Sequence, residues 1–353
     1  MKLPAASALF QRLRQTLRGH SDRALLLTAA LLLAASLWGP SLPMQRALFD
    51  HVVVLDITQS MNVRDMRLDG RPASRLDYAK HALRQSLVEM PCGSKLGWGI
   101  FTEYRSLLLL SPVEVCANLG ELRATLARID GRMAWTGNSE ITKGLYAGIG
   151  IAKQLPEHPG LVFVSDGQEA PPLNPRNRPA FGGKVGEVTG LVVGIGQLLP
   201  SPIPKVDPNG RPLGFWRADE VMQHDPRSQG RGGTGEAMVG EAVEGVAPAG
   251  AASATTATTG SEHLSALHEA HLRLLAGDTG LAYHRLTEVA PFIAALTAPA
   301  LARPVPARFD LAPVLAGLAL LLLVIRHLPA LLSPLLPALL PSWWPRLWPR
   351  KPS

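Results

Sequence analysis

Charged side chains and cysteines are scarce in this chain. Asp, Glu, Lys and Arg make up only 18% of its 353 residues, and residues 24–45 contain none of them. An uncharged apolar stretch of about 20 residues is typical of a transmembrane helix rather than of a soluble domain. The formal net charge of +7 comes mostly from the two ends, and no block of basic residues with interleaved aromatic residues lies between them. Binding to nucleic acid is therefore not expected.

The sequence predicts two membrane spans. The first covers residues 24–44 and follows a basic, cytoplasmic N-terminus, residues 1–23, which contains five Lys or Arg and one acid. A cleaved signal peptide is the alternative for this segment. The second span covers residues 309–328. Its uncharged core of fifteen residues reaches only about 22 Å as a helix, so flanking residues must extend it.

Both ends of the chain are basic, and the positive-inside rule therefore places them in the cytoplasm. The tail, residues 329–353, is broken by prolines and carries Trp, Arg and Lys. We expect it to lie at the membrane interface, with a third span as the alternative. The middle of the chain then lies outside the inner (plasma) membrane of a bacterium, in the periplasm of a Gram-negative cell.

The chain has only two cysteines, Cys92 and Cys116, and both fall in the predicted external part. An oxidising compartment allows a disulfide between them. Two unrelated buried thiols are the alternative.

Between the predicted spans, apolar runs typical of strands alternate with segments whose apolar residues recur at helical spacing. Strands are expected at residues 51–57, 95–101, 106–110, 161–164, 188–195 and 280–286, and helices at residues 75–90, 119–129, 140–155 and 263–277. This order predicts an α/β fold with a doubly wound, mostly parallel sheet, flanked by transmembrane helices, in which one hairpin adds an antiparallel strand. The core of the domain is expected at residues 48–197, and its final helix and strand at residues 261–292.

Residues 198–260 interrupt this pattern. The first part of this Pro/Gly/Ala-rich insertion is rich in Pro. The later part, about 225–260, is rich in Gly, Ala and Thr and lacks the periodic apolar residues that form a core, so we expect this later part to be flexible. The short stretch between the two parts could be ordered, with the aromatic side chains of Phe215 and Trp216 docked on the domain.

Hydroxyls and carboxylates follow two of the predicted strands. Asp56, Thr58 and Ser60 stand at alternate positions after the first strand, which places them on one side of an extended turn. Asp166 follows another apolar strand, and in parallel sheets such strand ends share one edge. Oxygen ligands of this kind suit Mg²⁺ or Ca²⁺. The loop of residues 135–141 can supply a further oxygen, from Ser139 or alternatively from Thr136.

These motifs resemble those of the von Willebrand factor A (VWA) domains. "DITQSM" looks like the family's D-x-S-x-S metal-ion-dependent adhesion site, with Thr58 in place of the middle serine, and "FVSDG" resembles the strand-end aspartate, here Asp166. "NSEITKGL" is similar to the loop in which a threonine precedes a helix, and Ser139 takes that position. The resemblance implies a metal site formed by Asp56, Thr58, Ser60, Ser139 and Asp166.

The wider layout is similar to that of bacterial membrane proteins of the BatA/BatB kind, and "AWTGNSEI" also resembles the Mxa-type (MxaC, MxaL) accessory proteins of methanol dehydrogenase. The resemblance implies a non-enzymatic, membrane-anchored module that binds a periplasmic or membrane protein, such as another VWA protein, through its metal. Its role would be assembly or maturation of a periplasmic complex, including metal loading of methanol dehydrogenase. The alternative is a metal-dependent hydrolase or phosphatase that uses Asp56 and Asp166.

Overall fold

The computed structural model describes residues 23–207, 209–224 and 260–332, in two units. The central unit is Ala47–Pro304, and the terminal unit contains the described residues of Met1–Arg46 and Val305–Ser353. The predicted N-terminal segment 1–23, apart from its last residue, and most of the predicted tail lie outside the described residues.

A six-stranded sheet forms the middle of the central unit, in the order β13-β8-β7-β2-β5-β6. Its strands are β2 (Asp50–Asp56), β5 (Lys95–Thr102), β6 (Arg105–Glu114), β7 (Gly160–Ser165), β8 (Gly190–Ile195) and β13 (Ala282–Leu286). All neighbouring strands are parallel except β5 and β6, which form an antiparallel hairpin. The predicted α/β class and mostly parallel sheet are confirmed.

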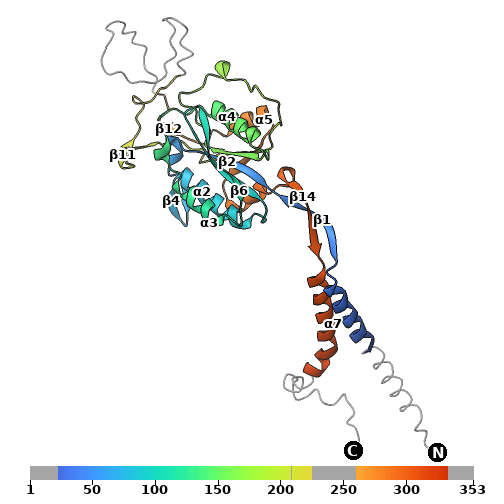
Figure 1. Cartoon of the computed structure of the whole chain (residues 1–353). Coiled ribbons are helices and arrows are strands. Elements are labelled where there is room, and N and C mark those ends of the chain that lie inside the picture. The colour runs from blue at the N-terminus through green and yellow to red at the C-terminus, as the bar shows by residue number, and fades with distance from the viewer. Residues whose placement is uncertain (1–22, 208, 225–259, 333–353) are drawn as a thin grey trace, which may run out of the picture. The chain divides into compact units, whose positions relative to one another are not determined.

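Helices cover both faces of this sheet (Figure 1). One face packs against α2 (Arg75–Glu89), α3 (Leu119–Arg128) and α6 (Val289–Leu296), and the other against α4 (Ile141–Gln154) and α5 (Glu269–Thr279). Successive side chains of β2 enter opposite layers: Val53 and Leu55 join the first core, and Val52 and Val54 the second. A strand buried on both faces must be apolar throughout, which explains the run that precedes Asp56.

Local signals in the sequence set the ends of several helices. Ser74 precedes α2, and its hydroxyl oxygen accepts a hydrogen bond from the backbone N–H of Asp77, which caps the helix. Gly280 ends α5 in the left-handed conformation, at φ 79°, which glycine adopts without strain. The last predicted helix is wrong at its start, because α5 begins at Glu269 and the residues before it form a short strand, β12 (Leu264–Ser265).

The predicted insertion is ordered in its first part. Residues 198–224 contain β9 (Ser201–Pro202), β10 (Pro204–Val206) and β11 (Pro212–Phe215). β10 pairs with β11, and β9 pairs with β12. The sequence did not predict these strands, because strands of two to four residues show no periodicity and become ordered by pairing. Residues 225–259 lie outside the described residues.

Shorter elements complete the central unit. β3 (Met66–Leu68) and β4 (Arg71–Ala73) form a hairpin, and 3-10 helices cover Gln59–Asn62, Gly131–Met133, Pro175–Asn177 and Pro299–Leu301.

The terminal unit contains a pair of strands and two helical segments. β1 (Ser41–Leu48) pairs with β14 (Arg303–Asp310), and α7 (Ala312–Leu332) follows β14. The first predicted span is wrong at its end, because the helix stops at residue 37, a left-handed Gly39 and Pro40 follow, and β1 begins at Ser41. Within the described residues, no helix is both long and apolar enough to cross a membrane.

Candidate functional site

The two predicted carboxylates lie at one edge of the sheet. Asp56 is the last residue of β2, Asp166 follows the last residue of β7, and β2 and β7 are parallel neighbours. The connection after β2 leads to β5 on one side of this pair, and the connection after β7 leads to β8 on the other side. Ligands bind at such switch points in open α/β sheets, at the carboxyl ends of the strands.

Asp56 organises the turn that follows β2. One carboxylate oxygen accepts hydrogen bonds from the backbone N–H of Thr58 at 2.9 Å and from its hydroxyl at 2.6 Å. The other accepts one from the Ser165 hydroxyl at 2.7 Å. The hydroxyls of Thr58 and Ser60 lie 3.4 Å apart. The alternate spacing thus brings the hydroxyls of Thr58 and Ser60 together in the turn after β2.

Burial dominates the electrostatics of Asp56. Burial and, to a smaller extent, the charge of Asp166 raise the pKa of this carboxyl, and the hydrogen bonds from Thr58 and Ser165 lower it; the net result is a pKa of about 7. A cation beside this carboxylate would stabilise its ionised form.

Asp166 has a charged partner that the sequence did not predict. Its carboxylate accepts a hydrogen bond from Arg75 at 2.5 Å and from the Ser265 hydroxyl at 3.1 Å. Arg75, at the start of α2, also donates to both carboxylate oxygens of Asp65. Arg75 therefore joins the loop after β2, the end of β7 and β12 in one buried network, and it neutralises part of the negative charge.

Ser139 carries an unpaired hydroxyl at this edge. Its backbone exchanges two hydrogen bonds with Ala170, of 2.6 and 2.7 Å, which holds the residue beside the loop after β7. Its side-chain oxygen is buried and has no hydrogen-bond partner among the described residues. By contrast, the Thr136 hydroxyl accepts a local hydrogen bond from the backbone N–H of Asn138. A buried hydroxyl without a partner is costly, so its presence points to an additional ligand.

A cavity of about 240 Å³ opens beside these groups. Thr58, Ser60 and Ser139 are part of its wall, whereas Asp56, Asp166 and Thr136 are not. Gln168 also lines it, and the side-chain oxygen of Gln168 is a second buried atom without a hydrogen-bond partner in the described part of the chain. Hard oxygen donors of this kind fit Mg²⁺ or Ca²⁺.

The segment 198–224 forms another wall of the cavity, with Ile203, Trp216, Glu220, Val221 and Met222. The indole N–H of Trp216 donates to the side-chain oxygen of Gln59, and the ammonium of Lys205 lies 4.4 Å from the centre of the Trp216 ring. Trp216 thus docks on the domain beside the loop that follows β2, whereas Phe215 is 58% exposed.

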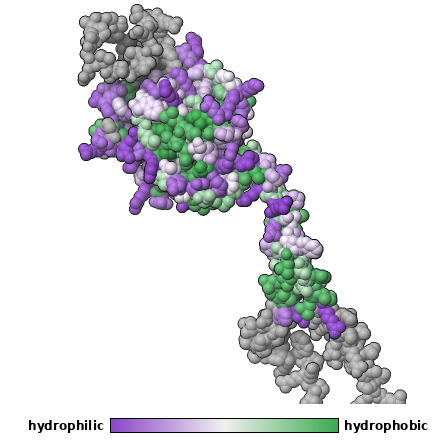
Figure 2. Space-filling model, in the orientation of Figure 1, coloured by the Kyte–Doolittle hydropathy of each residue, from purple (hydrophilic) through white to green (hydrophobic). Residues whose placement is uncertain are grey.

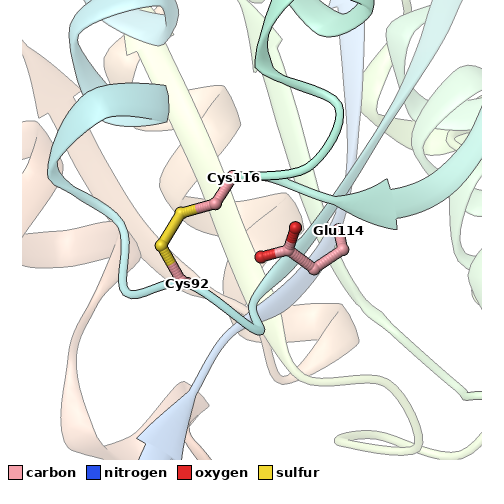
Figure 3. A group of neighbouring side chains, drawn as sticks. All are labelled: Cys92, Glu114 and Cys116. Carbon is pink, nitrogen blue, oxygen red and sulfur yellow. A yellow bond between two sulfur atoms is a disulfide. The ribbon is translucent and has the colours of Figure 1, made fainter.

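A second group of potential ligands lies at the base of the β5–β6 hairpin. The ligand atoms of Cys92, Glu114 and Cys116 lie within 4.8 Å of one another. Figure 3 shows the two cysteines joined by a disulfide, with the carboxylate of Glu114 beside it. Glu114 accepts hydrogen bonds from the backbone N–H groups of Ala117 and Gly93, and these lower its pKa. Disulfide sulfurs are not thiolates, so this group is not expected to bind a metal ion. The disulfide instead joins the two ends of the hairpin.

The sequence did not identify Arg75 or Gln168 as residues of the site. It suggested that Trp216 docks on the domain, but not that the insertion forms a wall of the cavity. Arg75 opens an amphipathic helix, where an arginine is usually solvated. Gln168 stands two residues after Asp166, and that position next to a strand end is the one signal that could have identified it.

Comparison with known proteins gives matches in structure only. No family model and no curated protein matches the chain. An aerotolerance-related membrane protein from Bacteroides fragilis is similar in structure, with 17% identity, a TM-score of 0.42, and coverage of 70% of this chain and 96% of that one. An uncharacterised membrane-spanning protein from Vibrio fischeri has 15% identity, a TM-score of 0.26, and coverage of 69% and 95%.

The PilB minor pilin of Streptococcus sanguinis also matches, with 18% identity, a TM-score of 0.27, and coverage of 35% of this chain and 31% of the pilin. At these TM-scores the likenesses carry no inference about function. The function must therefore be inferred from the geometry of this chain's own residues.

Proposed function

We propose that this protein is a membrane-anchored VWA-type module that binds Mg²⁺ or Ca²⁺ at the edge of its sheet and binds another protein through that ion. The buried, unpaired hydroxyl of Ser139, in the same cavity as Thr58 and Ser60, is the observation that carries the proposal. Hydroxyl residues from two loops line one cavity, and at least one of these hydroxyls, that of Ser139, has no hydrogen-bond partner among the residues that the structure describes.

The arrangement divides the metal ligands into two kinds. The hydroxyl oxygens of Thr58, Ser60 and Ser139 line the cavity and would bind the ion directly. Asp56 and Asp166 are hydrogen-bonded outside the cavity wall, so their carboxylates would act through water molecules of the shell. Mg²⁺ keeps several waters when bound to proteins, which suits this arrangement. An acidic side chain of the partner would complete the shell.

Binding fits the site better than hydrolysis does. Both oxygens of Asp56 accept hydrogen bonds, and Asp166 is paired with Arg75. Neither carboxylate is therefore placed as a general base toward a molecule in the cavity. We accordingly propose an accessory rather than an enzymatic role: assembly or maturation of a periplasmic complex, of which calcium loading into methanol dehydrogenase is the narrower form suggested by the sequence resemblance.

Apolar side chains of the terminal unit support membrane anchoring. Figure 2 shows them covering its helical part. They include Leu27, Leu31 and Leu37 on the first helical segment, Trp38 directly after it, and Leu320 and Ile325 on α7, all at least half exposed. Such a surface is unfavourable in water and favourable in lipid. With the basic termini, it supports anchoring in the inner membrane with the central unit in the periplasm.

A pull-down from detergent-solubilised membranes tests this function. The wild-type protein and Asp56→Ala would be compared in Mg²⁺, in Ca²⁺ and in EDTA. We expect a partner retained only by the wild type and only with a divalent ion. A partner retained equally by both proteins and in EDTA would place the binding surface elsewhere and contradict the proposal.

A further inference from the structure

Glu262 brings another carboxylate to the cavity that contains the three hydroxyls. It lies just before β12 and forms part of the wall together with Thr58, Ser60 and Ser139. Its side chain is half-buried, and its carboxylate has no hydrogen bond or ion pair with any residue in the described parts of the chain. A carboxylate that is withdrawn from water without a partner is unfavourable unless a cation joins it.

Glu220 lines the same cavity but is already neutralised. One of its carboxylate oxygens accepts a hydrogen bond from the ammonium of Lys205 at 2.6 Å, and the other accepts one from the backbone N–H of Arg217 at 3.1 Å. Of the two glutamates in the wall, Glu262 is thus the one whose charge is free to meet a metal ion.

The backbone of Glu262 is fastened to the loop after β7. The side-chain amide of Gln168 donates to the carbonyl oxygens of Glu262 and Leu264, at 3.3 Å each. Three residues after Glu262, Ser265 pairs with β9, and its hydroxyl donates to Asp166. Glu262 therefore keeps a set position relative to the proposed ligands. The unpaired side-chain oxygens of Ser139 and Gln168 in this cavity independently indicate that a ligand belongs there.

We propose that Glu262 is an internal metal ligand, which occupies the coordination position that a partner's carboxylate takes in the complex. This inference rests on the proposed function, because it requires the ion at Thr58, Ser60 and Ser139. The isolated protein then holds a closed metal site. A partner binds by displacing Glu262 with its own carboxylate. The cavity wall that contains Trp216 must then accommodate the partner's side chain.

Mn²⁺ binding by the full-length protein tests this ligand. Mn²⁺ takes the same oxygen donors as Mg²⁺, and the relaxation of water protons reports how many water molecules the bound ion carries. The proteins to compare are the wild type, Glu262→Gln, and Glu220→Gln as a control from the same wall. A Ser139→Ala variant monitors the proposed site itself, and circular dichroism checks that each variant is folded.

We expect Glu262→Gln to bind Mn²⁺ at least about tenfold more weakly and to give a higher water relaxivity per bound ion, because water replaces the carboxylate. Glu220→Gln should resemble the wild type in both respects. Should Glu262→Gln fail to fold, Glu262→Asp, whose carboxylate is one methylene shorter, is expected to show the same two changes.

Three other results would overturn the inference. If Glu262→Gln matches the wild type in affinity and relaxivity while Ser139→Ala binds weakly, the metal site exists but Glu262 is not its ligand. If the wild type binds no Mn²⁺, the proposed function fails, and this inference fails with it. The same two changes in Glu220→Gln instead of Glu262→Gln would assign the ligand role to Glu220.

Discussion

The guanidinium of Arg75 and the carboxylate of Asp166 form an ion pair of 2.5 Å in which neither side chain is exposed to solvent. Asp65, which is also largely buried, is the second partner of the same arginine, at 2.7 Å. Because two buried carboxylates depend on one cation, the loop after β2 and the loop after β7 are stabilised together.

Removal of this arginine should therefore be costly. Arg75→Met leaves Asp65 and Asp166 without their cation, and we expect a loss of about 3–5 kcal/mol in the free energy of unfolding. Urea unfolding followed by tryptophan fluorescence measures it. Arg273→Met is the matched control, since Arg273 forms an exposed pair with Glu269 within one helix, which is worth about 0.3–0.5 kcal/mol. Equal losses for the two variants would contradict the network.

Phe101 and Gly144 provide a test of the packing between α4 and the sheet. A Cβ atom at Gly144 would lie 2.1 Å from two carbons of the fully buried Phe101 ring. We expect Gly144→Ala to lower the free energy of unfolding by about 1–3 kcal/mol. On the same helix, a Cβ at Gly150 would meet no atom within 4 Å. Gly150→Ala should instead gain about 0.5–1 kcal/mol from helix propensity, and a loss at this position would show that the helix is packed differently.

The hairpin β5–β6 depends on its disulfide. Cys92 and Cys116 close a loop with a sequence separation of 24 residues. Replacement of both by Ser is expected to cost about 2–4 kcal/mol, chiefly because the unfolded chain gains freedom. Thiol counting under denaturing conditions should find no free thiol in the wild type, and unfolding curves measure the cost. Two free thiols per chain in protein isolated from membranes would contradict the pairing.

Asp56 makes the stability of the metal-free protein depend on pH. Its pKa is raised from 3.8 to about 7 in the folded protein, so the folded chain retains a proton that the unfolded chain releases. Between these pH values the contribution of Asp56 to stability falls as pH rises, by up to about 1.4 kcal/mol per pH unit. The difference between wild type and Asp56→Asn isolates this contribution. The pH dependence of this difference should become smaller in excess Mg²⁺. A difference in stability that does not change with pH would contradict the raised pKa of Asp56.

The sequence predicts the two strand ends of the site well, and the physical reason is simple. Strands buried on both faces are continuous apolar runs, so the first carboxylate after such a run marks the sheet edge, as at Asp56 and Asp166. The hydroxyls of Thr58 and Ser60 follow from the period of an extended chain. For these residues, the neighbouring sequence is enough to predict their place in the site.

The groups that sequence reasoning missed depend on distant partners. Arg75 meets Asp166 and Ser265 over sequence separations of 91 and 190 residues, and no local period reports such a contact. The wall formed by Trp216 follows a Pro-rich segment, whose short strands are ordered by pairing with each other and with β12. The position of Glu262 in the cavity likewise results from the pairing of β12 with β9, which tertiary structure alone determines.

Calorimetric titration of the purified full-length protein with Mg²⁺ and Ca²⁺ tests the central claim most directly. The comparison is wild type against Ser139→Ala and against Thr136→Ala, whose hydroxyl lies outside the cavity wall. The account predicts one ion bound per wild-type chain, affinity lowered at least about tenfold by Ser139→Ala, and no change with Thr136→Ala. Absence of binding by the wild type, or equal affinity of wild type and Ser139→Ala, would contradict it.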